Sequence, residues 1–235
     1  MADKSILKER FKKSLNTYNE NAIVQKQMAQ ELLNLIPLKN YNNILELGCG
    51  SGILTNLAIN RFKYNTYLAG DIVEECSQYI REDFFVCDID NFNPKNKYDL
   101  IISNAAMQWC EDIDKTVKVL MNALNDDGIL AFSTFGKENM FEIREIFNIG
   151  LNYYSLDELK EKFKKYNIIE LKDNVKTIEF KSIKEILKHI KMTGVNAFSP
   201  IKIAPKKLAS LMKDYDKKFG NKLTYHPILV VLKNN

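Results

Sequence analysis

The sequence predicts an α/β protein built on a seven-stranded, mostly parallel, doubly wound sheet. Short apolar segments recur along the chain with helical patterns between them, which is the alternation that produces a parallel sheet. The first apolar segment, ILEL, runs directly into the glycine-rich turn GCGSG. The chain has 235 residues, enough for one large domain, and carries no repeat or low-complexity linker.

Seven segments are expected to form the sheet because each is short and apolar and is bounded by turn residues. Pro227 lies near the start of the last one, where a missing N–H is tolerated at an edge or a bulge. The expected strands span residues 42–47, 65–70, 84–87, 99–103, 128–135, 175–180 and 223–232.

Helical patterns exceed what the two layers around such a sheet require. Residues 7–35 form an amphipathic stretch before the first strand, and residues 137–150, 155–166, 183–192 and 205–219 surround the sixth strand. We expect these later helices to form a cap over the carboxyl ends of the strands, where ligands of such sheets bind. The expected single domain, 1–235, then divides into an N-terminal helical segment (1–40), a binding core (41–135), a helical cap that includes the sixth strand (136–222) and a final strand (223–235).

The glycine turn is the strongest functional signal. Gly48, Gly50 and Gly52 allow a sharp turn and close backbone approach to a ligand, with Cys49 between them. The spacing G-x-G-x-G lacks the third-glycine offset of a dinucleotide site and the Lys-Ser/Thr pair of a P-loop. Glu46 places a carboxylate beside the turn, which disfavours a pyrophosphate and favours a cationic ligand. S-adenosylmethionine (SAM) carries a positively charged sulfonium and no phosphate, so it is the predicted ligand of this turn. The alternative is that the turn binds no ligand and only joins a strand to a helix.

Carboxylates follow the second and third strands. Asp71, with Ile72 after it, is placed to accept hydrogen bonds from ribose hydroxyls, or alternatively to cap the next helix. Asp88 is placed to meet the adenine amino group, with the N–H of Ile89 available to a ring nitrogen; the alternative is a turn-forming aspartate.

The fourth strand runs into SNAAMQWC, whose exposed end is expected beside the sulfonium. Asn104 is a candidate for polar contacts with the cofactor, and Gln108 and Trp109 are candidates to border the methyl group. Packing of Trp109 beneath the strand ends is the alternative.

Composition excludes several classes of protein. No apolar run is long enough to span a bilayer and the charged N-terminus has no apolar signal region, so we expect a cytoplasmic protein with no membrane partner. The four cysteines have no C-x-x-C pair, which predicts reduced, mostly buried thiols and no metal site.

Lysine residues gather in the C-terminal half of the chain, although the net charge of +4 is mild. The clusters are Lys160–Lys165, Lys202–Lys207 and Lys213–Lys218. They form either solvated helix faces or a docking surface for an acidic partner.

Five segments, spread over nearly the whole chain, together carry a resemblance to a known family: FKKSLNTYNENAIVQKQMAQELL, LELGCGSG, YDLIISNAAMQWC, GILAFSTFG and LTYHPILVVLK. They resemble the malonyl-acyl-carrier-protein O-methyltransferases of biotin synthesis, within the Rossmann-like class I methyltransferases. The glycine motif is specific only to class I, whereas SNAAMQWC, STFG and LTYH together are more specific.

This resemblance implies SAM-dependent methylation of the free carboxylate of a malonyl thioester, with S-adenosylhomocysteine as product. A carboxylate is ionised at neutral pH and needs no general base, which suits a chain with only two histidines, His189 and His226, both expected to be structural. Tyr18 matches the N-terminal motif and is the candidate to cover the methyl donor and contact substrate. Arg144 is the candidate clamp for the malonyl carboxylate, or else a surface arginine paired with glutamate. The lysine-rich helices would meet the acidic carrier protein, and a monomer is expected.

The sequence is also compatible with other functions. They are a class I methyltransferase acting on another small carboxylic acid, such as a tricarboxylate, or on a quinone carbon, and a SAM-binding module without catalysis. A nucleic-acid methyltransferase is disfavoured because SNAAM replaces the N/D-P-P-Y/F type of motif and because arginines are few.

Overall fold

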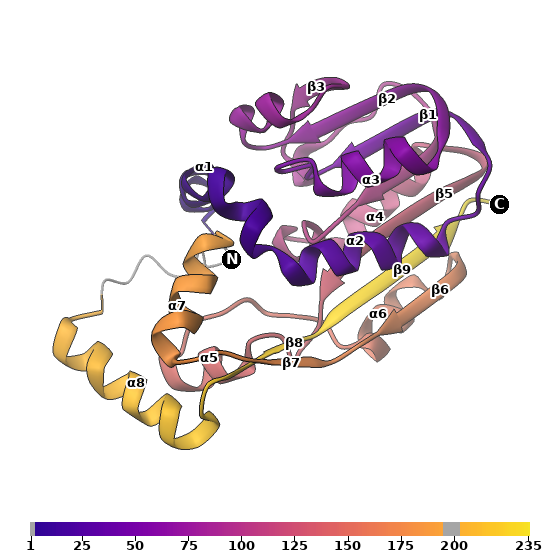
Figure 1. Cartoon of the computed structure of the whole chain (residues 1–235). Coiled ribbons are helices and arrows are strands. Elements are labelled where there is room, and N and C mark those ends of the chain that lie inside the picture. Colours follow the sequence, from indigo (N-terminus) through magenta and orange to yellow (C-terminus); the bar gives the residue numbers. More distant parts are fainter. Residues whose placement is uncertain (1–2, 195–202) are drawn as a thin grey trace.

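A seven-stranded sheet forms the centre of the molecule. The computed structural model describes residues 3–194 and 203–235 (Figure 1). The strand order is β3-β2-β1-β4-β5-β9-β6; neighbouring strands are parallel from β3 to β5, and β9 is antiparallel to both β5 and β6. This confirms the predicted mostly parallel sheet. Its strands are β1 (Asn40–Leu47), β2 (Lys63–Asp71), β3 (Asp83–Val86), β4 (Tyr98–Ser103), β5 (Leu124–Phe135), β6 (Asn167–Asp173) and β9 (Pro227–Lys233).

Helices cover both faces of this sheet. Successive residues of a strand point to opposite faces, and in β1 the side chain of Ile44 packs in the layer of α2 and α3, whereas Leu45 packs in the layer of α4 and α6. The α-helices are α1 (Lys4–Asn21), α2 (Ile23–Leu35), α3 (Ile53–Arg61), α4 (Ile113–Asn122), α5 (Phe141–Phe147), α6 (Leu156–Phe163), α7 (Ile183–Met192) and α8 (Pro205–Phe219). The short 3₁₀ helices are η1 (Glu74–Tyr79), η2 (Ile89–Asn91) and η3 (Met107–Trp109).

The predicted sixth strand was wrong. The main-sheet strand β6 lies earlier, at Asn167–Asp173, and the segment predicted as a strand at 175–180 instead forms β7 (Lys176–Glu179), which pairs with β8 (Lys222–Tyr225) in a separate two-stranded sheet. The edge strand β6 carries charged residues and leaves Ile169 48% exposed, so its apolar signal is weak. The predicted last strand is likewise divided at His226, between β8 and β9. Pro227 begins β9, a position where its missing N–H costs little.

Of the predicted additional helices, α1 and α7 lie together at one end of the sheet, whereas α2 and α6 cover its faces. The predicted stretch 7–35 is two helices, because the chain bends at Ala22, and 137–150 and 155–166 contain the shorter helices α5 and α6. In Figure 1, α7, α8 and the β7–β8 ribbon extend away from the main sheet, and α1 lies beside α7. Among residues 3–194 and 203–235, no helix has the length and apolar character needed to cross a membrane.

Candidate active site

The glycine turn joins β1 to α3 at the carboxyl end of the sheet. Gly48, Gly50 and Gly52 all have positive φ angles, of 72°, 54° and 78°. A Cβ atom at Gly48 would lie 2.4 Å from the Cβ of Ala106, so only glycine fits there. The N–H groups of Gly48 and Cys49 donate to the carbonyl of Gly70, at 2.8 and 3.1 Å, which fixes the turn against β2.

A cavity opens above this turn. It is lined by nearly all the residues predicted from the sequence to bind cofactor or substrate, the exceptions being Gly52 and Arg144. Those that line it are Tyr18, Glu46, Gly48, Cys49, Gly50, Asp71, Ile72, Asp88, Ile89, Asn104, Gln108 and Trp109.

Glu46 brings a buried carboxyl group to the wall of the cavity. Its Oε2 accepts hydrogen bonds from Thr55 Oγ1 at 2.7 Å and Tyr67 OH at 2.5 Å, and its Oε1 is buried without a partner among the described residues. Burial raises the pKa of Glu46 to about 7, although the two hydroxyl donors oppose that rise. A buried acceptor without a donor is costly, so a cationic or N–H-bearing ligand would complete this site.

Asp71 ends β2 and is 6% exposed. Its Oδ2 accepts from the N–H of Gly50 at 2.9 Å and its Oδ1 from the N–H of Val73 at 2.9 Å. Burial raises the pKa of Asp71, while these main-chain donors limit the rise. The carboxylate therefore ties β2 to the glycine turn and keeps further acceptor capacity for a ligand hydroxyl.

Asp88 is held by the N-terminal helix. Lys4 Nζ lies 2.7 Å from Asp88 Oδ1 and 2.6 Å from Asp90 Oδ2. Burial would raise the pKa of Asp88, but the hydrogen bond from Lys4 and the other donors outweigh it, so the pKa is lowered. Asp88 also caps η2 by accepting from the N–H of Asp90, which is the turn-forming alternative weighed from the sequence.

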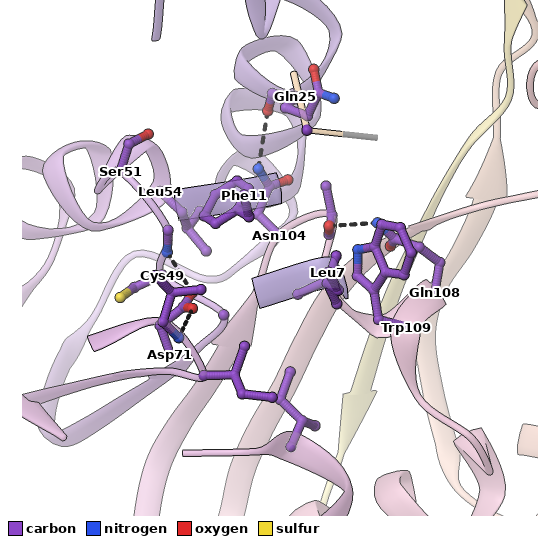
Figure 2. Close-up of a pocket in the computed structure, with 18 of the residues that line it drawn as sticks. Leu7, Phe11, Gln25, Cys49, Ser51, Leu54, Asp71, Asn104, Gln108 and Trp109 are labelled. Atoms are coloured by element: carbon purple, nitrogen blue, oxygen red, sulfur yellow. Dashed lines mark hydrogen bonds between the residues drawn. The ribbon is translucent and has the colours of Figure 1, made fainter. Parts of the chain in front are cut away.

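Helix α1 covers the cavity. Figure 2 shows the side chains of Leu7 and Phe11 between the glycine-turn residues and Trp109, and both line the cavity. Phe11 lies so close to Gly50 that a Cβ there would be 3.1 Å from its ring. Asn19 accepts a hydrogen bond from Ser51 Oγ at 2.6 Å, which ties the far end of α1 to the glycine turn.

Asn104 and Gln108 form the wall after β4 (Figure 2). Asn104 Nδ2 donates to the carbonyl of Gln25 at 3.1 Å, and its Oδ1 accepts from Ser133 Oγ at 2.6 Å, so its side chain links β4 to α2 and β5. Gln108 Nε2 donates to the carbonyl of Ala105 at 2.6 Å, while its Oε1 is buried without a partner among the described residues.

Tyr18 presents a neutral phenol to the cavity. Burial, and then the nearby Asp71, raise the pKa of Tyr18, so its hydroxyl remains a donor. Its ring makes an edge contact with Phe11, with the ring centroids 5.1 Å apart.

Neither histidine lines the cavity. His189 Nε2 lies 2.7 Å from Tyr225 OH, and burial lowers the pKa of His189; His226 Nε2 lies 2.8 Å from Asp173 Oδ2.

Arg144 and Gly52 lie outside the cavity wall. The Arg144 guanidinium donates to the carbonyls of Lys137 and Asn139 and lies over the ring of Tyr153, 5.5 Å from its centroid. Its contacts are therefore with the main chain and an aromatic ring, and not with a neighbouring glutamate. Gly52 directly precedes α3, and its N–H donates a hydrogen bond to the carbonyl of Cys49 at 2.9 Å, which closes the turn.

A second cavity, of about 290 Å³, lies between η3 and residues 150–154. It shares Gln108, Trp109, Cys110 and Phe135 with the first cavity. The predicted burial of thiols holds for Cys49, Cys76 and Cys87, whereas Cys110 is half-buried at this shared wall.

Several site residues escaped the sequence analysis. Lys4, Leu7 and Phe11 recur at helical spacing on one face of α1, and that spacing was the available signal. Thr193 and Gly194 also line the cavity, but nothing in their local sequence indicates it.

Comparison with known proteins agrees with this geometry. A family model described as a methyltransferase domain matches residues 18–168. A malonyl-[acyl-carrier protein] O-methyltransferase of Calditerrivibrio nitroreducens is 33% identical over 97% of this chain and 96% of its own length, and the enzyme of the same name from Haemophilus influenzae is 32% identical over 98% and 95%. The chain belongs to the malonyl-[acyl-carrier protein] O-methyltransferase family. It is a class I, SAM-dependent methyltransferase.

Solved structures show the same fold. A putative methyltransferase of Bacillus halodurans, 13% identical, superposes with a TM-score of 0.64 over 87% of this chain and 97% of its own. A Haemonchus contortus methyltransferase whose structure holds S-adenosylhomocysteine is 18% identical and superposes with a TM-score of 0.54. The superposition covers 89% of this chain and 53% of the Haemonchus chain. The unpartnered Oε1 of Glu46, the carboxylates of Asp71 and Asp88 and the glycine turn fit SAM as the cofactor of this family.

Proposed function

We propose that this protein transfers the methyl group of SAM to the free carboxylate of malonyl-acyl-carrier protein, giving the methyl ester used in biotin synthesis. The site observation that supports this acceptor is the neutral phenol of Tyr18, which lines the cavity and can donate a hydrogen bond to a carboxylate oxygen. A carboxylate acceptor is already ionised at neutral pH and needs no general base. The near full-length match to relatives of that name supports the same acceptor.

SAM supplies an electrophilic methyl group on a positively charged sulfur. The protein then has to bind the cofactor and the acceptor, orient them toward each other and shield them from water. We assign the methionine end of the cofactor to Glu46 and the glycine turn, the ribose to Asp71 and Ile72, and the adenine to Asp88 and Ile89. These assignments follow from the order of the strands, because β1, β2 and β3 end one beside the next along the sheet.

The acceptor carboxylate is assigned to the side of the cavity where Tyr18 lies. Its phenol stays protonated and can donate a hydrogen bond to a carboxylate oxygen. Leu7 and Phe11 exclude water above the reacting atoms, which leaves the carboxylate less solvated and more nucleophilic. Arg144 is assigned to positioning through Tyr153, which lines the second cavity, because its guanidinium is engaged by main-chain carbonyls.

The carrier protein is assigned to the lysine-rich helices. Lys206, Lys207, Lys213 and Lys217 lie on α8, which is outermost in Figure 1, and further lysines lie on α6. Lys202, part of one predicted cluster, lies outside the described residues. An acidic carrier would be attracted to this surface in a salt-dependent manner.

The test is mass spectrometry of malonyl-carrier protein, malonyl-coenzyme A and a tricarboxylate after incubation with SAM. Methylation of the malonyl thioesters is expected, and methylation of the tricarboxylate alone would overturn the proposal.

Tyr18→Phe and Arg144→Ala should each leave SAM affinity within about threefold but lower malonyl-carrier methylation far more. Full activity in Arg144→Ala would remove Arg144 from substrate positioning.

A further inference from the structure

The second cavity has no role in holding the cofactor as assigned above. It lies between η3 and residues 150–154 and shares Gln108, Trp109, Cys110 and Phe135 with the cofactor cavity. The two cavities therefore adjoin along the side chains that they share. A ligand whose reactive end is in the first cavity can have its remainder in the second.

The wall of this cavity suits an uncharged ligand with hydrogen-bonding groups. Thr134, Asn152 and Tyr153 offer hydroxyl and amide groups, and Trp109 offers an aromatic surface. Glu111 also lines it, and no lysine or arginine is among its described lining residues. This wall would repel a carboxylate, which needs cationic or N–H partners. A neutral chain with amides is favoured there.

The shared wall also holds an acceptor in need of a donor. Gln108 Nε2 is engaged with the carbonyl of Ala105 at 2.6 Å, which leaves Gln108 Oε1 buried and without a partner among residues 3–194 and 203–235. Leaving such an oxygen unpaired is unfavourable by the cost of its desolvation. An amide N–H reaching the wall from the second cavity would satisfy it.

We propose that the second cavity binds the pantetheine arm of the malonyl thioester, with an amide N–H of the arm donating to Gln108 Oε1. This inference rests on the proposed function. The malonyl carboxylate then lies in the first cavity beside Tyr18, and the thioester sulfur lies near the side chains that the two cavities share. Carrier protein and coenzyme A bear the same arm, so the cavity recognises the chemistry that both substrates share.

Trp109 makes a direct binding test possible, because it is the only tryptophan in the chain and lines both cavities. Pantetheine without a malonyl group is titrated into the protein saturated with S-adenosylhomocysteine, which keeps the first cavity filled. A saturable change in Trp109 emission is expected. Pantetheine should also inhibit methylation of malonyl-coenzyme A competitively.

Asn152→Phe places a bulkier side chain at an exposed position of the cavity wall, so the fold should tolerate it. We expect pantetheine affinity to fall at least about tenfold, with affinity for S-adenosylhomocysteine unchanged. Asn96→Phe is the matched control: Asn96 is exposed before β4, at the opposite edge of the sheet, and its variant should behave as wild type.

Two outcomes would overturn the inference: no saturable response in the wild-type protein, or equal pantetheine affinity in Asn152→Phe and Asn96→Phe. A wild-type protein that methylates malonyl-coenzyme A yet gives either of those results loses only the arm site. A protein that methylates no malonyl thioester loses the proposed function, whatever its response to pantetheine.

Discussion

At the residue scale, two buried carboxyl groups, those of Glu46 and Asp71, differ in the hydrogen-bond donors that the protein offers them. Glu46 and Asp71 are both buried in the ligand-free protein, and both have pKa values raised by burial. They differ in their partners, since Asp71 accepts two main-chain N–H groups whereas one oxygen of Glu46 accepts none among the described residues. Asp71 therefore has a structural role beside its proposed role in ligand binding, and we expect the unpartnered oxygen of Glu46 to contact the ligand.

Glu46→Gln should stabilise the ligand-free protein at pH 8 relative to wild type. The folded-state pKa of Glu46 is raised from its ordinary 4.5 to about 7. Wild-type stability is therefore fully present below about pH 4.5 and is lost as pH rises to about 7, because the unfolded chain releases the proton first. The advantage of the variant should grow by roughly 2 kcal/mol between pH 5 and pH 8, as measured by denaturant unfolding.

The same change should weaken SAM binding about tenfold at pH 8, since a carboxylate binds an ammonium more strongly than an amide does. Glu20→Gln, on an exposed part of α1, is the control and should alter neither property. A pH-independent difference between Glu46→Gln and wild type would show that the Glu46 carboxyl is ionised normally.

Asp71→Ala should lower SAM affinity by roughly 1–3 kcal/mol, the range for hydrogen bonds to a charged group. Calorimetry measures the affinity and a thermal scan reports the fold, which loses the bonds from Gly50 and Val73. Asp83→Ala, exposed at the start of β3, is the matched control. Unchanged affinity would leave Asp71 with the structural role alone.

At the scale of elements, helix α1 covers one side of the cofactor cavity. The side chains of Leu7 and Phe11 lie across the cavity. One end of α1 is held by the ion pairs of Lys4 with Asp88 and Asp90. The other end is held by the hydrogen bond that Asn19 accepts from Ser51. We expect the cofactor to enter past this helix. Because the Lys4 pairs are partly exposed, each contributes little, which suits a contact that has to open.

Lys4→Met should speed SAM association about threefold to tenfold at low salt, because a partly exposed ion-pair cluster is worth about 1 kcal/mol. Added salt should speed the wild type more than the variant, as screening weakens the same contact. Stopped-flow emission of Trp109 follows binding. Lys8→Met, one turn further along on an exposed position, should match wild type. Slower association in Lys4→Met would mean that Lys4 assists binding.

The molecule as a whole places its lysine-rich helix α8 away from the main sheet (Figure 1). Charge distribution over the whole surface governs the encounter with a charged macromolecule more than the chemistry within the cavity does. A carrier-linked substrate and its coenzyme A analogue should therefore respond differently to changes on α8.

Reversing Lys206 and Lys207 to glutamate should raise the KM for malonyl-carrier protein by about tenfold and affect malonyl-coenzyme A less. Lys63→Glu with Lys95→Glu makes the same change in net charge at exposed positions on the amino edge of the sheet, and is the control. Steady-state kinetics on both substrates decide the point. Equal KM changes for the two substrates would identify the α8 lysines as a solvated face.

The sequence by itself determined six of the seven strands of the main sheet and most of the residues that line the cofactor cavity. Glycine spacing, Glu46 and the acidic residues at strand ends are local signals, and parallel strands bring their carboxyl ends to one edge, so residues distant in the chain meet predictably. Glu46, Asp71 and Asp88 accordingly line one cavity.

Only the tertiary structure decided the rest. Whether 167–173 or 175–180 joins the main sheet depends on pairing with β9, a long-range contact that local apolar pattern does not encode. The positions of Lys4 over Asp88, of Arg144 against main-chain carbonyls, and of the second cavity depend on how α1 and residues 150–154 pack across the strand ends. Packing between segments far apart in sequence leaves no periodic trace in either segment, so these features become visible only in three dimensions.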